Sequence, residues 1–114
     1  MLARSYRLLL DHDFQKIYKR GKRITTPHLR IFYLPIQGGS SRFGFVIPSK
    51  TVKNIVERNR LKRVLRAQLA SLVPRLRSGY GVIFLAGGKL RDSASGAIRE
   101  ELTRALSQIG VLRQ

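Results

Sequence analysis

The stretch ERNRLKRVLR, Glu57 to Arg66, holds the side chains with the clearest chemistry in this sequence. Its ten positions carry five cations, one acid and three apolar residues. An arginine offers a planar pair of donors that fits two phosphate oxygens, and a lysine offers a compact charge. These residues therefore predict a phosphate-binding surface, provided that one face of a helix presents them together.

A helical projection divides this stretch and its continuation into two faces. One face is apolar and spans roughly 140° at 100° per residue; it contains Leu61, Val64, Leu65, Leu69 and Leu72. The opposite face, called the cationic face below, consists of Asn59, Arg60, Lys62, Arg63 and Arg66. A solvated face usually mixes charges because like charges three or four residues apart repel, yet Glu57 is the only acid between Asp13 and Asp92. A nucleic-acid partner explains this face better than solvation does.

The apolar residues before this stretch are out of phase with it. Val52, Ile55 and Val56 lie about half a turn away from the later apolar face, so one straight helix cannot bury both sets. We therefore expect an irregular segment first and regular helix from about Glu57. Free backbone N–H groups at that helix start would add to phosphate binding.

Three aromatic residues lie close in sequence to basic ones. Phe14 and Tyr18 share one predicted helix face, and Phe32 shares a strand face with Arg30. Core packing explains at least one of these rings. A partly open sheet face with rings and cations also suits a single-stranded nucleic acid, whose bases stack on aromatic side chains.

The chain offers little for catalysis or metal binding by protein groups. It has no cysteine, and its two histidines, His12 and His28, lie at a predicted helix start and strand start rather than beside an orienting carboxylate. Asp11 and Asp13 fit the first turn of a helix. We therefore assign no catalytic residue and no metal ligand.

The elements that position these residues follow from periodicity and stop signals. We predict one domain over residues 1–114, with elements in the order αββαβα and an α+β or α/β sandwich fold. The predicted elements are a helix over 11–20 ended by Gly21, an antiparallel hairpin of strands over 28–36 and 41–48, a helix to about Leu72, a buried strand over 80–86 and a helix over 93–110. A βαβ crossover between the last two strands is right-handed by default.

Residues of the strand over 28–36 alternate between its two faces. Leu29, Ile31 and Tyr33 are expected on one face. The other face is expected to carry Arg30, Phe32 and Leu34.

Charge and composition narrow the class of partner. The chain has 23 Lys and Arg residues against 6 Asp and Glu, a formal charge of +17 over 114 residues. Nucleic acid is the first candidate, ahead of an anionic membrane surface. DNA read by sequence is disfavoured because a recognition helix needs base-reading side chains on its exposed face, and the cationic face offers almost only cations. The absence of cysteine and of an apolar run near 20 residues fits a cytoplasmic protein without a membrane span.

The same residues carry a resemblance to a known family. GFVIPSKTVKNIVERNRLKRVLRAQL, 44–69, resembles the signature segment of the bacterial ribonuclease P protein subunit, with Ser-Lys and Val followed by Arg-Asn-Arg-x-Lys-Arg. RLLLDHDFQKIYKRGKR is similar to that family's opening pattern, so the match covers nearly the whole chain. Thr51, Lys53, Gly81 and Ala86 depart from residues frequent in the family.

The resemblance implies a fold and a function. The fold is a small mixed sheet with a left-handed βαβ crossover, as in the second domain of ribosomal protein S5. The function is that of a subunit of a ribonucleoprotein endoribonuclease, in which a catalytic RNA and the Mg²⁺ that it binds remove the 5′ leader of precursor tRNA. A non-enzymatic RNA-binding protein, such as a ribosomal protein, is the alternative.

The resemblance also implies roles for particular residues. Those expected to contact the catalytic RNA are Arg58, Asn59, Arg60, Lys62, Arg63 and Arg66. Those expected to line a cleft for the leader of precursor tRNA are Phe14, Tyr18, Phe32 and Lys50.

Overall fold

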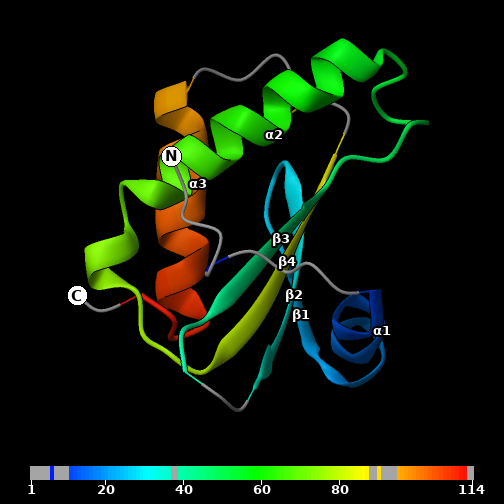
Figure 1. Ribbon diagram of the computed structural model, residues 1–114. Coiled ribbons are helices and arrows are strands. Elements are labelled where there is room, and N and C mark those ends of the chain that lie inside the picture. The colour runs from blue at the N-terminus through cyan, green and yellow to red at the C-terminus, as the bar shows by residue number, and fades with distance from the viewer. Residues whose placement is uncertain (1–5, 7–10, 37–38, 88–89, 91–94, 113–114) are drawn as a thin grey trace.

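A computed structural model describes residues 6, 11–36, 39–87, 90 and 95–112 (Figure 1). Its elements follow the chain in the order α1 (Asp11–Arg20), β1 (Lys22–Thr25), β2 (Leu29–Pro35), β3 (Arg42–Val46), α2 (Ile55–Ala70), β4 (Tyr80–Ala86) and α3 (Ser95–Gln108). A short 3-10 helix, η2 (Val73–Arg75), follows α2 and contains Pro74.

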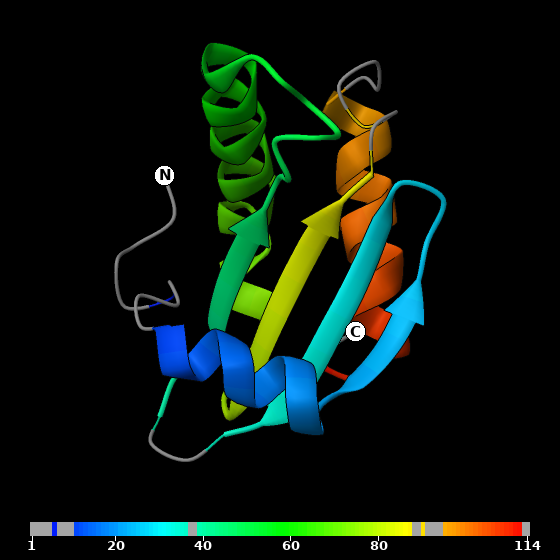
Figure 2. The ribbon, with the colours of Figure 1, turned by 90° about the vertical axis from the view of Figure 1, so that its right-hand side faces the viewer.

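The strands form one mixed sheet in the order β1-β2-β4-β3. β4 pairs antiparallel with β2 and parallel with β3, so Ile83 lies opposite both Phe32 and Gly44. Figure 2 shows α1 across one face of this sheet, with α2 and α3 on the other face. The α+β fold predicted from the sequence is confirmed, with one strand more than expected.

The connection from β3 through α2 to β4 is left-handed. In Figure 2 both strands run upward, α2 lies behind the sheet, and the chain moves from β3 to β4 on its right. The right-handed default is therefore wrong here. The left-handed crossover implied by the family resemblance is confirmed.

Two features of the sheet differ from the sequence prediction. β2 and β3 do not form a hairpin, because β4 lies between them and pairs with both. β4 takes the centre because YGVIFLA is apolar on both of its faces, as a strand covered on both sides requires. β1 was not predicted because KRIT is short, cationic and mostly exposed, which is typical of an edge strand.

The two faces of the sheet pack against different helices. Leu29 and Ile31 are buried in the main core beneath α2 and α3, with Tyr33 packed against it. Phe32 and Leu34 pack instead on Ile17 and Ile83, beneath α1. The predicted alternation along β2 is confirmed for these residues.

Two glycines let α1 lie close to the sheet. The Gly21 N–H donates to the Ile17 carbonyl oxygen at 2.8 Å at the end of α1. A Cβ atom at Gly21 would lie 2.5 Å from that oxygen and 2.7 Å from the carbonyl oxygen of Tyr33. At Gly81 a Cβ atom would lie 2.7 Å from Cδ1 of Ile17. The absence of a side chain at Gly81 therefore leaves room for Ile17 of α1, which packs with Ile83 between α1 and the sheet.

Among the described residues, no helix is both long and apolar enough to cross a membrane.

Candidate nucleic-acid interface

The first turn of α2 is capped by Asn54. Its Oδ1 accepts hydrogen bonds from the backbone N–H groups of Val56 at 2.8 Å and Glu57 at 3.3 Å. The helix begins at Ile55, two residues before the predicted start at Glu57. Because Asn54 already binds these two N–H groups, the expectation that they are free for phosphate is wrong.

The turn before α2 is held by side chains from both of its ends. The carbonyl oxygen of Pro48 accepts from the Thr51 hydroxyl at 2.7 Å and from the Val52 N–H at 3.1 Å. From the other end, Nη1 of Arg58 donates to the carbonyl oxygens of Val52 at 2.8 Å and Lys53 at 2.9 Å. Arg58 therefore positions the turn, and Thr51, a departure from the family pattern, stabilises it.

The rest of α2 has the two faces that the helical projection predicts. Its inward residues are buried in the main core: Leu61, Leu65, Leu69 and, just beyond the helix, Leu72. Of the cationic face, Asn59, Arg60 and Arg63 are exposed, while Lys62 and Arg66 are half-buried. The structure thus brings all five residues to one side of a single helix.

Glu57 is paired with a member of this face. Nη2 of Arg60 donates to Oε1 of Glu57 at 2.6 Å, and its Nε lies 3.1 Å from the same oxygen. This hydrogen bonding with Glu57 raises the pKa of the Arg60 guanidinium. Arg60 would therefore have to share or leave Glu57 to bind a phosphate.

The predicted leader residues Phe14, Tyr18 and Phe32 gather between α1 and the outer face of the sheet. The rings of Tyr18 and Phe32 meet edge to face, with centroids 4.9 Å apart and planes at 77°. Phe14 and Phe32 both pack on Ile17 and Ile83. Tyr18 stays 40% exposed, and partial burial raises the pKa of its hydroxyl. The cluster is thus part core and part accessible aromatic surface.

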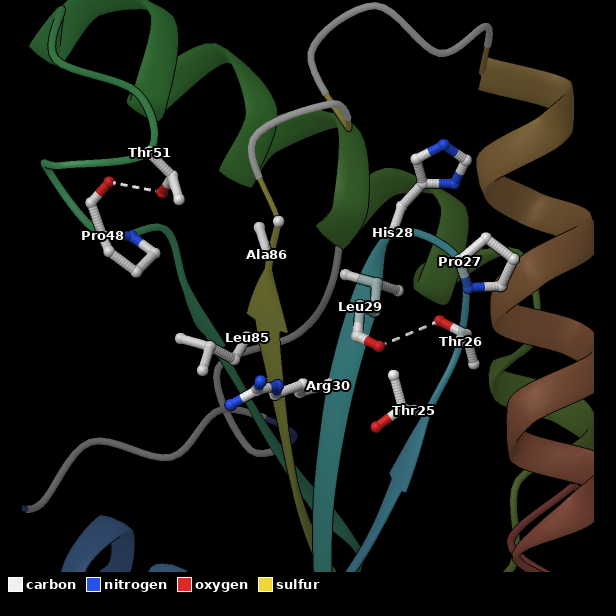
Figure 3. A pocket seen from close by; sticks show the side chains of 11 residues that line it. Thr25, Thr26, Pro27, His28, Leu29, Arg30, Pro48, Thr51, Leu85 and Ala86 are labelled. Carbon is white, nitrogen blue, oxygen red and sulfur yellow. Dashed lines mark hydrogen bonds between the residues drawn. The ribbon is translucent and has the colours of Figure 1, made fainter.

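Lys50 lies apart from these rings. It is exposed in the turn between Pro48 and Thr51. Figure 3 shows Pro48 and Thr51 beside the end of β4 that carries Leu85 and Ala86, and in Figure 2 α1 crosses the opposite end of the sheet. A hollow of about 330 Å³ opens beside this turn, lined by Pro48, Thr51, Arg30 and Leu85 among others. Arg30 and Phe32 share the outer face of β2, so a strip of sheet connects the aromatic cluster with this hollow.

One contact was not anticipated from the sequence. Glu101 of α3 accepts hydrogen bonds from the Thr26 hydroxyl at 2.5 Å and the His28 N–H at 3.0 Å, and its Oε1 lies 2.7 Å from Nδ1 of His28. Burial opposes ionisation of Glu101, but the hydrogen bonds from Thr26 and His28 outweigh it and lower its pKa. His28 therefore does lie beside an orienting carboxylate, and the cluster ties the β1–β2 turn to α3.

The described residues include no group of three or more His, Cys, Asp or Glu side chains that could hold a metal ion. Within that part of the chain, the charged surface consists mainly of arginine and lysine. Its chemistry is that of anion binding.

Known proteins include relatives of this chain. A family model described as Ribonuclease P matches residues 2–110. A ribonuclease P protein component from Microcystis aeruginosa is 38% identical over 104 residues, which cover 87% of each chain. One from a Synechococcus strain is 34% identical over 116 residues, covering 98% of this chain and 87% of the relative.

Solved structures share the fold. The RNase P protein of Thermotoga maritima superposes with a TM-score of 0.81 at 25% identity, covering 90% of this chain and 96% of that one. The RNase P protein of Staphylococcus aureus gives a TM-score of 0.84 at 24% identity, covering 95% and 98%.

Proposed function

Because the chain belongs to the ribonuclease P protein family, we propose that it binds the catalytic RNA of ribonuclease P and the 5′ leader of precursor tRNA. In this role it assists removal of the leader, which gives the mature 5′ end of the tRNA. The RNA carries the chemistry and binds the Mg²⁺ ions, and this chain contributes binding and orientation.

The observation that carries the proposal is the presence of two separate surfaces suited to RNA. α2 lies on one side of the sheet, and its cationic face supplies guanidinium and ammonium groups for phosphates. The aromatic cluster beneath α1 lies on the other side and offers rings on which unpaired bases can stack. The cationic face suits the phosphates of a structured RNA, and the aromatic cluster suits the unpaired bases of a single-stranded RNA.

The residues divide between these surfaces. We assign catalytic-RNA contacts to Asn59, Arg60, Lys62, Arg63 and Arg66, with Arg58 positioning the turn beside them. For the leader, Phe14, Tyr18 and Phe32 form the stacking end, and Lys50 gives a phosphate contact at the far end of the sheet.

Reconstitution tests the proposal. The purified protein alone is expected not to cut precursor tRNA, but to restore cleavage by the cognate catalytic RNA at low Mg²⁺ concentration. Affinity of the complex for precursor tRNA is expected to rise over the first few leader nucleotides. A general RNA-binding protein would leave that affinity independent of leader length, and failure to stimulate the RNA would refute the proposal.

A further inference from the structure

Ile55 and Val56 form an exposed aliphatic pair at the first turn of α2. Their side chains are 62% and 70% exposed. Within the described part of the chain, the only other large hydrophobic side chain in this state is Tyr18, in the aromatic cluster. Single exposed aliphatic residues are ordinary on protein surfaces, so the argument depends on where this pair lies.

The pair lies at a projecting end of the molecule. Figure 1 shows this end of α2 and the turn before it extending beyond the sheet. Asn54 caps the helix below the pair, and Arg58 fixes the preceding turn. Val52, in that turn, is 1% exposed and belongs to the core, whereas Ile55 and Val56 lie outside the core.

The positive charge around Ile55 and Val56 indicates which kind of partner can bury these two side chains. Lys53, Asn59 and Arg60 are exposed around it, and the chain as a whole carries a formal charge of +17. A second copy of the chain would bring two cationic surfaces together, and their repulsion opposes that contact. A polyanion pairs with these cations through its phosphates. The methyl groups of Ile55 and Val56, however, make no favourable contact with phosphate.

We propose that Ile55 and Val56 make apolar contact with bases or riboses of unpaired nucleotides in the RNA that the cationic face binds. This inference rests on the proposed function and specifies the kind of RNA at that site. A regular RNA duplex presents phosphates and 2′-hydroxyl groups, whereas loops and bulges expose the apolar faces of bases. The start of α2 therefore meets a loop or bulge, and the cations farther along the helix meet phosphates.

Affinity for the cognate ribonuclease P RNA, measured against salt concentration, tests the contact. The double variant Ile55→Thr/Val56→Thr keeps β-branched side chains and so nearly the same helix propensity. It is expected to bind about ten-fold more weakly, with the slope of log K against log salt unchanged, because apolar burial is lost and no charge is removed. Ala97→Thr, at an exposed helical position on α3 and outside the cationic face, is the matched control and should change neither quantity.

The outcomes separate this inference from the function on which it rests. If the natural protein neither binds nor stimulates the catalytic RNA, the proposed function fails. If the natural protein binds and the folded double variant, checked by circular dichroism, binds equally well, only the inference fails. A flatter salt slope in the double variant would also overturn the inference, since it would mean that phosphate contacts were lost.

The absence of cysteine from the sequence allows a direct map of the contact. Val56→Cys gives a single attachment point for an iron–EDTA reagent that cleaves nearby RNA, and Ala97→Cys, at an exposed position on α3, gives the control. Cleavage from position 56 is expected within unpaired nucleotides. Cleavage confined to a continuous duplex, or disulfide-linked dimers of the unlabelled Val56→Cys protein formed without RNA, would overturn the proposal.

Discussion

The guanidinium of Arg58 donates a hydrogen bond to the carbonyl oxygen of Val52 at 2.8 Å, from the first turn of α2 back to the turn before it. A second bond joins the same Nη1 to the carbonyl oxygen of Lys53. Both acceptors lie in the segment that leads into the exposed start of α2. An arginine that the family pattern assigns to RNA thus also shapes the surface that its neighbours present.

Replacing Arg58 separates these two roles. Arg58→Ala is expected to lower the free energy of unfolding in urea by about 1–2 kcal/mol, because two carbonyl groups lose a charged donor. Arg58→Lys keeps the charge but lacks the planar fork, so RNA affinity should fall while its salt dependence stays the same. If Arg58→Lys matches the natural protein in stability and affinity, charge alone matters at this position.

Removing the one acid beside the cationic face should strengthen RNA binding. In Glu57→Gln, Arg60 loses its ion pair and becomes available to phosphate. Affinity for the catalytic RNA at low salt is expected to rise several-fold, with a salt dependence at least as steep. Glu100→Gln makes the same charge change at an exposed position on α3 and is the control. Equal gains from both variants would show that total charge, and not Arg60, is responsible.

Tyr18 allows a test of leader binding with little cost to the core, because it is the most exposed ring of the aromatic cluster. Tyr18→Ala is expected to weaken binding of precursor tRNA by about 1–3 kcal/mol, the contribution of one stacked base. Binding of mature tRNA and the salt dependence should stay unchanged. Tyr18→Phe keeps the ring and should keep most of the affinity. A loss that is equal for mature and precursor tRNA would contradict this assignment.

The sequence predicts local features of this protein well where one periodicity dominates. The strand over 80–86 has the bounds of β4, and the inward face of α2 was correct at Leu61, Leu65 and Leu69. These predictions succeed because burial of a continuous apolar face outweighs weaker local preferences.

Two of the errors concern contacts between residues distant in sequence. β4 lies between β2 and β3 in the sheet. The turn residues between β2 and β3 in the sequence do not reveal this strand order. The contact of His28 with Glu101 spans 73 positions, and neither residue has a local pattern that indicates it. Of the candidate site, the cationic face could be read from spacing, whereas the distance between Lys50 and the rings depends on where α1 crosses the sheet.

The position of α1 over the sheet is expected to depend on Gly21. In Gly21→Ala the new methyl group would meet two backbone carbonyl oxygens, which cannot move as a side chain can. The free energy of unfolding is expected to fall by about 1–3 kcal/mol, and leader affinity should fall in the folded protein because α1 shifts. Gly96→Ala is the control, since a Cβ atom there meets nothing within 4 Å. Equal stability of both variants would show that the close packing at Gly21 is unimportant.

The Glu101 cluster should give stability a specific dependence on acid. Because the folded state lowers the pKa of Glu101, its carboxylate stabilises the fold above the pKa of the unfolded chain, about 4.3. That stabilisation is lost as the pH falls through the lower pKa of the folded state. Glu101→Gln is expected to cost about 1–2 kcal/mol at pH 7, since hydrogen bonds to a charged group are lost.

The difference in unfolding free energy between the natural protein and Glu101→Gln should shrink as the pH falls below about 4.3. Urea unfolding at a series of pH values measures it. Glu100→Gln, at an exposed neighbouring position, is the matched control and should show no such change. A difference that stays constant down to the acid transition would mean that Glu101 stabilises the β1–β2 turn through packing and not through its charge.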